Sequence, residues 1–218
     1  MYREETIMKI AVINEVSARD KNKDIIAALD ALNLDYINVG MSQGDASAEL
    51  TYIHTGLMAG ILLNLGAVDT VIGGCGTGEG FMISAMQYPK VFCGLISEPL
   101  GAWLFGKING GNCISLALNY AYGWAGNINL KYIFEKLFQD APGTGYPPER
   151  AESQGQSREQ LNKISLLTHR TMREILESID KDILETVLLH KPLARAVTGA
   201  VKDLELQSYL INKIKELS

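Results

Sequence analysis

The chain is poor in cysteine, with three among 218 residues: Cys75, Cys93 and Cys113. Their number is odd, their spacing is wide, and no two of them form a C-x-x-C pair. This pattern argues against a disulfide framework and against a structural zinc site. It is typical of reduced thiols, so we expect a cytoplasmic protein.

Long apolar runs and an excess of positive charge are also missing. No apolar run reaches the roughly 18 residues that span a bilayer, and the polar segment 1–7 has no apolar signal-peptide region. The formal net charge is -5, whereas general nucleic-acid binding usually needs a basic surface. We therefore expect neither a membrane nor a nucleic acid as partner, while small anionic ligands remain compatible with a local positive field.

The most informative segment that is present reads GGCGTGEG, at residues 73–80. It combines a thiol, a hydroxyl and five glycines directly after an apolar run at 70–72. Glycine lets a ligand approach the backbone closely, and successive N–H groups at a helix start can bind an anion. A cysteine placed there has its thiolate form favoured, which suits a nucleophile or a base. Such chemistry suits a sugar phosphate, or a carbonyl substrate that reacts through an enediolate.

Other interpretations of this segment are weaker. Glycine-rich turns also occur for packing alone, and a buried cysteine is usually a small hydrophobe. Interior glycines cost roughly 0.5–1 kcal/mol each relative to alanine, so five in one turn need a further reason. No Gly-Lys-Ser/Thr follows, which excludes a P-loop, and the glycine register does not fit a Rossmann fingerprint.

Short apolar runs alternate with helical patterns up to about residue 138. The runs predict strands at 8–13, 35–39, 68–72, 91–96 and 113–118, and the apolar spacing predicts helices at 20–32, 48–65, 81–86, 99–107 and 125–138. This alternation predicts an α/β protein with a flavodoxin-like, Rossmann-type three-layer fold around a five-stranded parallel sheet. Ligands of such sheets bind beyond the carboxyl ends of the strands, where the glycine turn lies.

The rest of the chain has a different composition. After an α/β domain at 1–140, a segment rich in proline, glycine, serine and charge predicts a connector at 141–156. A C-terminal helical extension at 157–218 follows, with a capping box at 157–160 and helices at 161–178, 181–189 and 201–217. We expect this extension to pack on the sheet domain or on a second subunit.

Four segments, taken in order, make the chain similar to a known family. They read KIAV at 9–12, CGTGEG at 75–80, SEP at 97–99 and NGGN at 109–112. Over residues 8–140 they resemble type B ribose-5-phosphate isomerases and the related galactose-6-phosphate isomerases. The resemblance implies a sugar-phosphate aldose–ketose isomerase that works through a cis-enediol without a metal ion or other cofactor. It also implies a homodimer or larger homo-oligomer with sites near the subunit interface.

The resemblance implies catalytic roles within the glycine turn. Cys75 is the base that moves a proton between C1 and C2 of the sugar. Thr77 and the backbone N–H groups of Gly76, Gly78 and Gly80 hold the developing oxyanion. These assignments agree with the general chemistry of thiolates and preorganised N–H donors.

The candidate substrate-binding residues come from several segments. Tyr52 and Asn109 match family residues, and Arg150 stands in for a basic G-R-H segment of the family. Glu15 follows the first strand and would bind a sugar hydroxyl, although a helix-capping role fits it equally well. Glu79 is either a second acid–base group or a solvated loop carboxylate.

Departures from the family pattern bear on the substrate. Val16 stands where the family has a phosphate-contacting histidine, and Ile108 where it has the histidine that opens the sugar ring. Met86 and Gln87 replace an asparagine and a lysine. Two alternatives are therefore a catalytically diverged sugar-phosphate-binding protein, and an isomerase or epimerase of a different sugar that need not be phosphorylated.

Overall fold

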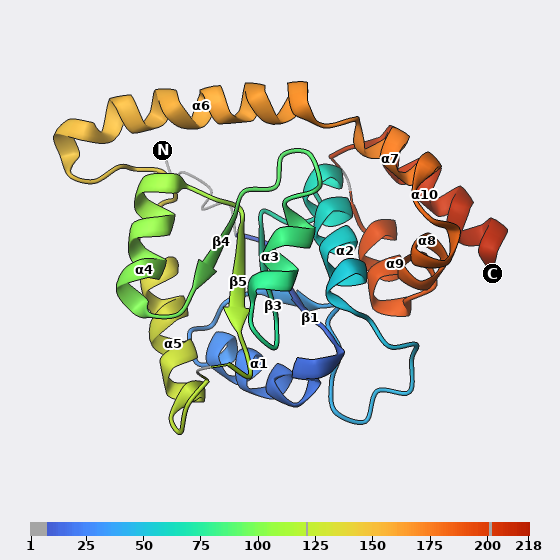
Figure 1. Ribbon diagram of the computed structural model, residues 1–218, viewed down its shortest axis with the longest axis horizontal. Helices are drawn as coiled ribbons and strands as arrows, with labels where there is room; N and C mark the ends of the chain where they lie inside the picture. Colours follow the sequence, from blue (N-terminus) through green and yellow to red (C-terminus); the bar gives the residue numbers. More distant parts are fainter. Residues whose placement is uncertain (1–7, 121, 201) are drawn as a thin grey trace, which may run out of the picture.

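A five-stranded sheet forms the centre of the computed structural model, which describes residues 8–120, 122–200 and 202–218 (Figure 1). The strands are β1 (Ile10–Asn14), β2 (Tyr36–Asn38), β3 (Thr70–Cys75), β4 (Cys93–Ile96) and β5 (Cys113–Ala117). All paired strands are parallel, and their order is β2-β1-β3-β5-β4. The predicted five-stranded parallel sheet is confirmed, but its last two strands are exchanged relative to the flavodoxin order 2-1-3-4-5.

The exchange places β5 inside the sheet and β4 at its edge. The first four residues of β5 are buried, as expected for a strand that is covered on both faces. β4 is shorter, and its Leu95 is 41% exposed. As a result, the strands that flank β3 are β1 and β5, and their carboxyl ends border the end of β3.

Helices cover both faces of the sheet (Figure 1). One face carries α2 (Tyr52–Leu65) and α3 (Glu79–Ala85), and the other carries α1 (Asn22–Asp30), α4 (Pro99–Leu104) and α5 (Gly126–Leu137). Side chains of β1 alternate between the two layers, because successive residues of a strand point to opposite faces. Ala11 and Ile13 join the α2 layer, and Ile10 and Val12 join the α1 layer.

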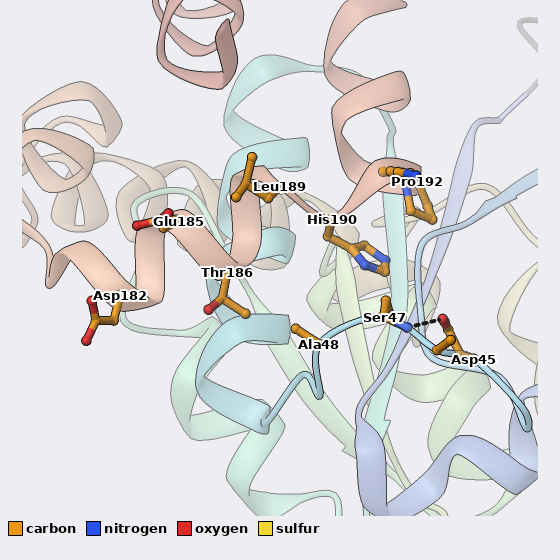
Figure 2. Close-up of a pocket in the computed structure, with 11 residues that line it drawn as sticks. Asp45, Ser47, Ala48, Asp182, Glu185, Thr186, Leu189, His190 and Pro192 are labelled. Carbon is orange, nitrogen blue, oxygen red and sulfur yellow. Dashed lines mark hydrogen bonds between the residues drawn. The ribbon is translucent and has the colours of Figure 1, made fainter. Parts of the chain in front are cut away.

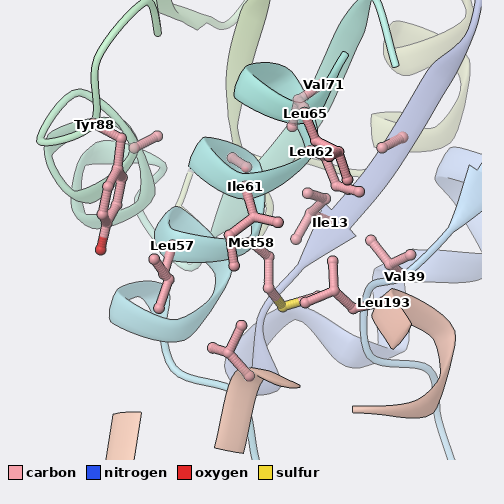
Figure 3. Close-up of a cluster of buried hydrophobic side chains, with 14 of the residues drawn as sticks. Ile13, Val39, Leu57, Met58, Ile61, Leu62, Leu65, Val71, Tyr88 and Leu193 are labelled. Carbon is pink, nitrogen blue, oxygen red and sulfur yellow. The ribbon is translucent and has the colours of Figure 1, made fainter. Parts of the chain in front are cut away.

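Helix α2 is apolar around its circumference because it lies between the sheet and the C-terminal helices. Leu57, Met58 and Ile61 are completely buried. Figure 3 shows them together with Ile13 of β1 and Leu193 of the C-terminal region. A helix that is hydrophobic on all sides is a buried helix, so the tail packs on the sheet domain, which was one of the two expected arrangements.

The C-terminal region forms α6 (Ala151–Thr168), α7 (Met172–Ser178), α8 (Lys181–Leu188), α9 (Lys191–Thr198) and α10 (Leu204–Leu217). Buried side chains of α7 to α10 belong to the same hydrophobic cluster as those of α2. Helix α6 differs, because it lies across one end of the molecule (Figure 1) and exposes Leu161, Ile164 and Leu167. Within the described part of the chain, no helix has both the length and the apolarity needed to cross a membrane.

Several predicted boundaries are wrong. Helix α6 begins at Ala151, inside the predicted connector 141–156, and Ser157 lies in its interior rather than at a cap. The predicted helix at 161–178 is two helices, because Thr171 and Glu174 form a capping box that starts α7. Helix α2 begins four residues later than predicted, at Tyr52, because its N-cap residue Thr51 has an extended backbone conformation. The division into domains at residues 140 and 156 stays a prediction.

Candidate active site

Cys75 is the last residue of β3 and lies at the carboxyl edge of the sheet, in register with Ala117 of β5. The sequence predicted that this strand ends at residue 72, whereas it continues to Cys75 itself. Cys75 is 5% exposed, and its Sγ lies 4.0 Å from the Oγ1 of Thr77. The thiol is thus held by the sheet, and the hydroxyl by the turn that follows.

The glycines of the turn have different structural causes. A Cβ on Gly73 would lie 2.0 Å from Cζ of Phe81, so this glycine lets α3 pack on β3. Gly78 has a φ of +79°, and a Cβ there would lie 2.6 Å from Cδ1 of Leu95. Gly76 is less crowded, with the Oγ of Ser17 nearest at 3.2 Å. Packing therefore explains Gly73 and Gly78, while Gly76 is half-buried and borders the open side of the turn.

Helix α3 starts directly after this turn. Gly78 is its N-cap residue, and Glu79 is its first residue. The first N–H groups of a helix have no helical carbonyl partner and carry a partial positive charge. Thr77 and Glu79 are exposed and Gly80 is half-buried. The turn thus brings amide donors and a hydroxyl next to the Cys75 thiol.

Glu15 follows β1 and lies beside β3. Its N–H donates to the carbonyl of Gly74 at 3.3 Å. Its carboxylate caps the short helix η1 (Val16–Lys21) by accepting from the N–H of Ser17 at 3.0 Å, and the Ser17 hydroxyl also donates to it. Glu15 is 5% exposed. The capping role, one of the two expected, is present, and binding of a sugar hydroxyl stays a prediction.

Ser17 and Asn119 border the turn, although the sequence pattern does not single them out. The N–H of Asn119 donates to the Gly76 carbonyl at 3.0 Å, and its Nδ2 donates to the Ser17 carbonyl at 2.8 Å. Both residues follow strands that flank β3 in the sheet, after β1 and after β5. The signal that identifies them is the strand order, which an alternation of strands and helices does not reveal.

Tyr52 covers the other end of the turn. It is the first residue of α2 and is 46% exposed. A Cβ on Gly80 would lie 3.1 Å from Cγ of Tyr52, so the ring lies directly against this glycine. His54 instead caps the start of α2, where its Nδ1 accepts from the N–H of Thr51 at 3.0 Å. Burial lowers the pKa of His54.

Asn109 and Arg150 do not join Cys75 within one chain. Asn109 ends the π-helical turn η2 (Phe105–Asn109), which precedes the amino end of β5. Val71 pairs with Cys113 at the amino edge of the sheet, and Cys75 pairs with Ala117 at the carboxyl edge. These two edges are therefore about 13 Å apart, at 3.3 Å per residue of β3. Arg150 ends η3 (Pro148–Arg150) and is exposed. Arg150 lies near η2, because Gly145, in the segment before it, donates its N–H to the Lys107 carbonyl at 2.8 Å.

The short helix η1, which Glu15 caps, carries a cationic side chain. Arg19 lies two residues after Ser17, and its Nη1 is 3.8 Å from Oε1 of Glu49. The side chains of this ion pair are 48% and 70% exposed, so the pair contributes little energy. This pair therefore does not fix the Arg19 side chain in place.

Comparisons with known proteins show which family the chain resembles. The family model described as Ribose/Galactose Isomerase matches residues 10–137. The solved structure of a 4-deoxy-L-threo-5-hexosulose-uronate ketol-isomerase, complexed with a tartrate, is 36% identical, with a TM-score of 0.89 over 96% of this chain and 100% of that one. A ribose-5-phosphate isomerase from Vibrio parahaemolyticus is 40% identical, with a TM-score of 0.90 over 97% of this chain and 99% of that one.

More distant structures share the fold alone. A ribose 5-phosphate isomerase from Thermotoga maritima is 18% identical and has a TM-score of 0.58 over 72% of this chain and 98% of its own. It thus leaves more than a quarter of this chain uncovered, whereas the two more similar structures cover nearly all of it. No curated protein matches the chain by sequence.

Proposed function

The chain belongs to the ribose/galactose isomerase family, whose members are aldose–ketose isomerases, and from this premise we propose that Cys75 transfers the proton in its reaction. The observation that carries the proposal is the distance of 4.0 Å between Cys75 Sγ and Thr77 Oγ1 at the start of α3. A base, a hydroxyl donor and unpaired amide donors then face one reacting carbon and its oxygen.

The proposed reaction starts from an open-chain aldose. The Cys75 thiolate removes the proton from C2, the electron pair forms the C1–C2 double bond, and the C1 oxygen takes the negative charge. The Thr77 hydroxyl and the amide groups of the turn stabilise this enediolate. The proton of the C2 hydroxyl moves to the C1 oxygen, and Cys75 returns its proton to C1, which yields the ketose.

Glu15 and Tyr52 are the proposed contacts for the rest of the sugar chain. Both border the turn, Glu15 from the β1 side and Tyr52 from the Gly80 side. The Glu15 carboxylate already accepts from Ser17, so we propose that a substrate hydroxyl adds to this arrangement. We propose that Glu79, exposed at the start of α3, assists proton exchange with the sugar oxygens.

A sugar phosphate is the first candidate substrate. It is supported by the family and by the ribose-5-phosphate isomerase that is 40% identical over nearly the whole chain. The amide groups at the start of α3 suit an anionic group of any kind. A pentose or hexose phosphate therefore belongs in any test of activity.

An open-chain sugar acid is the second candidate, and specific residues favour it. Ile108 has no proton to transfer to a ring oxygen, so a substrate that is already open-chain avoids the missing step. Val16 has no cationic side chain for a phosphate, whereas Arg19 on η1 provides a guanidinium that suits a single carboxylate. The ketol-isomerase that is 36% identical acts, by its description, on such a uronate.

The test is isomerisation of a panel that contains pentose phosphates, hexose phosphates, free sugars and 4-deoxy-5-hexosulose-uronate. Wild type, Cys75→Ala and Cys93→Ser are compared, because Cys93 is a buried thiol outside the site. We expect one compound to be turned over, with a loss of about 100-fold or more in Cys75→Ala and little change in Cys93→Ser. Turnover that survives Cys75→Ala would remove Cys75 as the base. Ligand-induced stabilisation without turnover of any compound would favour a diverged binding protein.

We also propose that the complete site needs a second copy of the chain. Asn109 and Arg150 lie at the amino edge of the sheet, away from Cys75 of the same chain. The exposed apolar side chains Ile83 of α3 and Ile164 of α6 supply surface that a homodimer would bury. A cytoplasmic location stays a prediction, based on three free cysteines in the chain.

A further inference from the structure

Ser115 is a buried polar residue in an apolar strand. It lies in the middle of β5, between Ile114 and Leu116, and is 0% exposed. A buried hydroxyl is costly unless it forms a hydrogen bond. His190, another buried polar residue, meets this need away from the glycine turn, beside the cavity that Figure 2 shows. Ser115 meets it within the turn.

The partner of this hydroxyl is a backbone carbonyl of the glycine turn. Ser115 Oγ donates to the carbonyl of Gly78, the N-cap residue of α3. Ser115 is in register with Gly73 of β3, two residues before Cys75, so it lies about 7 Å inside the carboxyl edge of the sheet. The hydrogen bond therefore directs the Gly78 carbonyl inward, away from that edge.

The Gly78 carbonyl has a second partner, the N–H of Met82 at 3.2 Å. That bond joins the carbonyl to α3 and moves with the helix, whereas the bond to Ser115 connects the turn to the sheet. A carbonyl oxygen has two lone pairs, so both of its accepting positions are filled. Ser115 is thus the side chain that fixes this peptide group relative to Cys75, which ends the neighbouring strand.

The segment that begins with β5 also holds the earlier carbonyl groups of the turn. The N–H of Leu118 donates to the Cys75 carbonyl at 3.0 Å, and the N–H of Tyr120 donates to the Gly76 carbonyl at 2.8 Å. In a planar trans peptide, the C=O and the N–H of the following residue point in opposite directions. The β5 side therefore takes up these carbonyl groups, and the amide groups that follow them point away from it.

The Glu79 N–H is the amide group that Ser115 orients, because it belongs to the same peptide as the Gly78 carbonyl. With that carbonyl directed into the sheet, the N–H points out beyond the carboxyl edge, where Cys75 lies. Among the described residues, no carbonyl accepts from this N–H. If the peptide turned over, a carbonyl oxygen would replace the N–H and repel the negative charge of an enediolate.

We propose that Ser115 is a positioning residue of the isomerase, which keeps the Glu79 N–H directed at the substrate oxygen that becomes negative. Ser115 does not itself touch the substrate, since it is completely buried below the turn. The inference rests on the proposed function, because that function assigns the turn to the enediolate. It adds the Glu79 N–H to the oxyanion donors and gives β5 a part in the reaction.

The test compares Ser115→Ala with Ser115→Thr, which keeps the hydroxyl, on the compound that the wild type isomerises. Since the interaction forms only in the transition state, Ser115→Ala should lower kcat by about 10- to 100-fold and change KM by less than about twofold. Ser115→Thr should retain kcat within about threefold, because strands accept β-branched residues. Ser165→Ala is the matched control. It removes another buried serine, whose Oγ accepts from the Lys90 N–H at 2.9 Å on α6, and should have wild-type kcat.

A measurement without substrate tests the orientation directly. Ser115→Ala should shift the Glu79 amide signals in a ¹H–¹⁵N spectrum, whereas Ser165→Ala should leave them unchanged, with urea denaturation showing that both variants fold. A wild-type kcat in Ser115→Ala, or an unmoved Glu79 amide signal, would overturn the role of Ser115. Turnover that survives Cys75→Ala would refute the proposed function instead, so the two failures differ in the variant that reveals them.

Discussion

At the residue scale, the candidate active site depends on a backbone conformation that one glycine permits. Gly78 has a φ of +79°, and a Cβ added to it would lie 2.6 Å from Cδ1 of Leu95 and 3.0 Å from the N atom of Ala117. The same residue is the N-cap of α3, so it orients the amide groups that follow Cys75. Thr77 precedes it directly. A change at Gly78 should therefore alter both stability and the geometry of the proposed oxyanion donors.

Gly78→Ala should lower the free energy of unfolding by about 2–3 kcal/mol and reduce turnover by more than tenfold. The left-handed conformation costs about 1–2 kcal/mol for a residue with a Cβ, and the contacts add to this. Gly44→Ala is the control, since Gly44 has a φ of +84° with nothing within 4 Å of its Cβ position. Urea denaturation and initial rates check both variants. Equal stability and activity of the two would contradict the role given to Gly78.

His190 gives the second prediction at this scale. Burial lowers its pKa in the folded chain, so the unfolded chain binds more protons at pH values between the two pKa values. The free energy of unfolding should therefore fall as the pH drops through about 6.5, by no more than about 1.4 kcal/mol per pH unit for one proton. Urea denaturation at pH 5.5 and 7.5 measures this slope.

His190→Gln should flatten that slope, and His169→Gln controls for the loss of another histidine from the C-terminal region. A slope that is unchanged in His190→Gln would assign the pH dependence to other groups. The same variant keeps a side-chain amide that can donate to the Val39 carbonyl, so a large loss of stability is not expected.

At the scale of elements, the contact between α2 and α3 positions the glycine turn. A Cβ on Gly56 would lie 2.1 Å from Oγ and 2.8 Å from the backbone C of Ser84, so the two helices approach closely at this point. Since α3 begins at the turn, this contact determines where its first amide groups lie. The sequence shows a glycine in a helical pattern, but the partner helix is visible only in the fold.

Gly56→Ala should destabilise the protein by about 1–3 kcal/mol, because it overpacks the contact between α2 and α3. Gly155→Ala, on α6, should have the opposite effect, because a Cβ on Gly155 has room. Its nearest neighbour, Nη2 of Arg158, lies 3.6 Å away. The substitution should stabilise by about 0.5–1 kcal/mol through helix propensity. Urea denaturation of both variants checks the pair, and effects of the same sign would refute the packing argument.

At the scale of the whole molecule, the proposed homodimer explains why predicted site residues lie at two edges of the sheet. Cys75 and Thr77 lie at the carboxyl edge, and Asn109 lies beyond the amino edge. A two-fold assembly brings the same two surfaces together twice. Each site would then use the glycine turn of one protomer and Asn109 of its partner.

Co-expression of Cys75→Ala with Asn109→Ala tests this arrangement. Each variant alone should have little activity, and the mixture should regain about a quarter of the wild-type activity, because half of the random dimers contain one intact site of two. Sedimentation velocity of each sample checks that dimers form. A mixture that is no more active than its components, although dimers exist, would contradict a shared site.

The sequence by itself determined the fold class of this protein and predicted where its chemical centre lies. Short apolar runs and helical spacing suffice for a parallel α/β sheet, and the turn at 73–80 makes Cys75 and Thr77 the candidate residues, because these features are local. Tertiary structure decided the strand order, which buries β5 inside the sheet and leaves β4 at its edge, since the apolar sequences of the two strands do not by themselves distinguish these positions. That order brings Ser17 and Asn119 to Gly76 and leaves Asn109 at the opposite edge. Contacts between segments about a hundred residues apart depend on packing, which no local pattern contains.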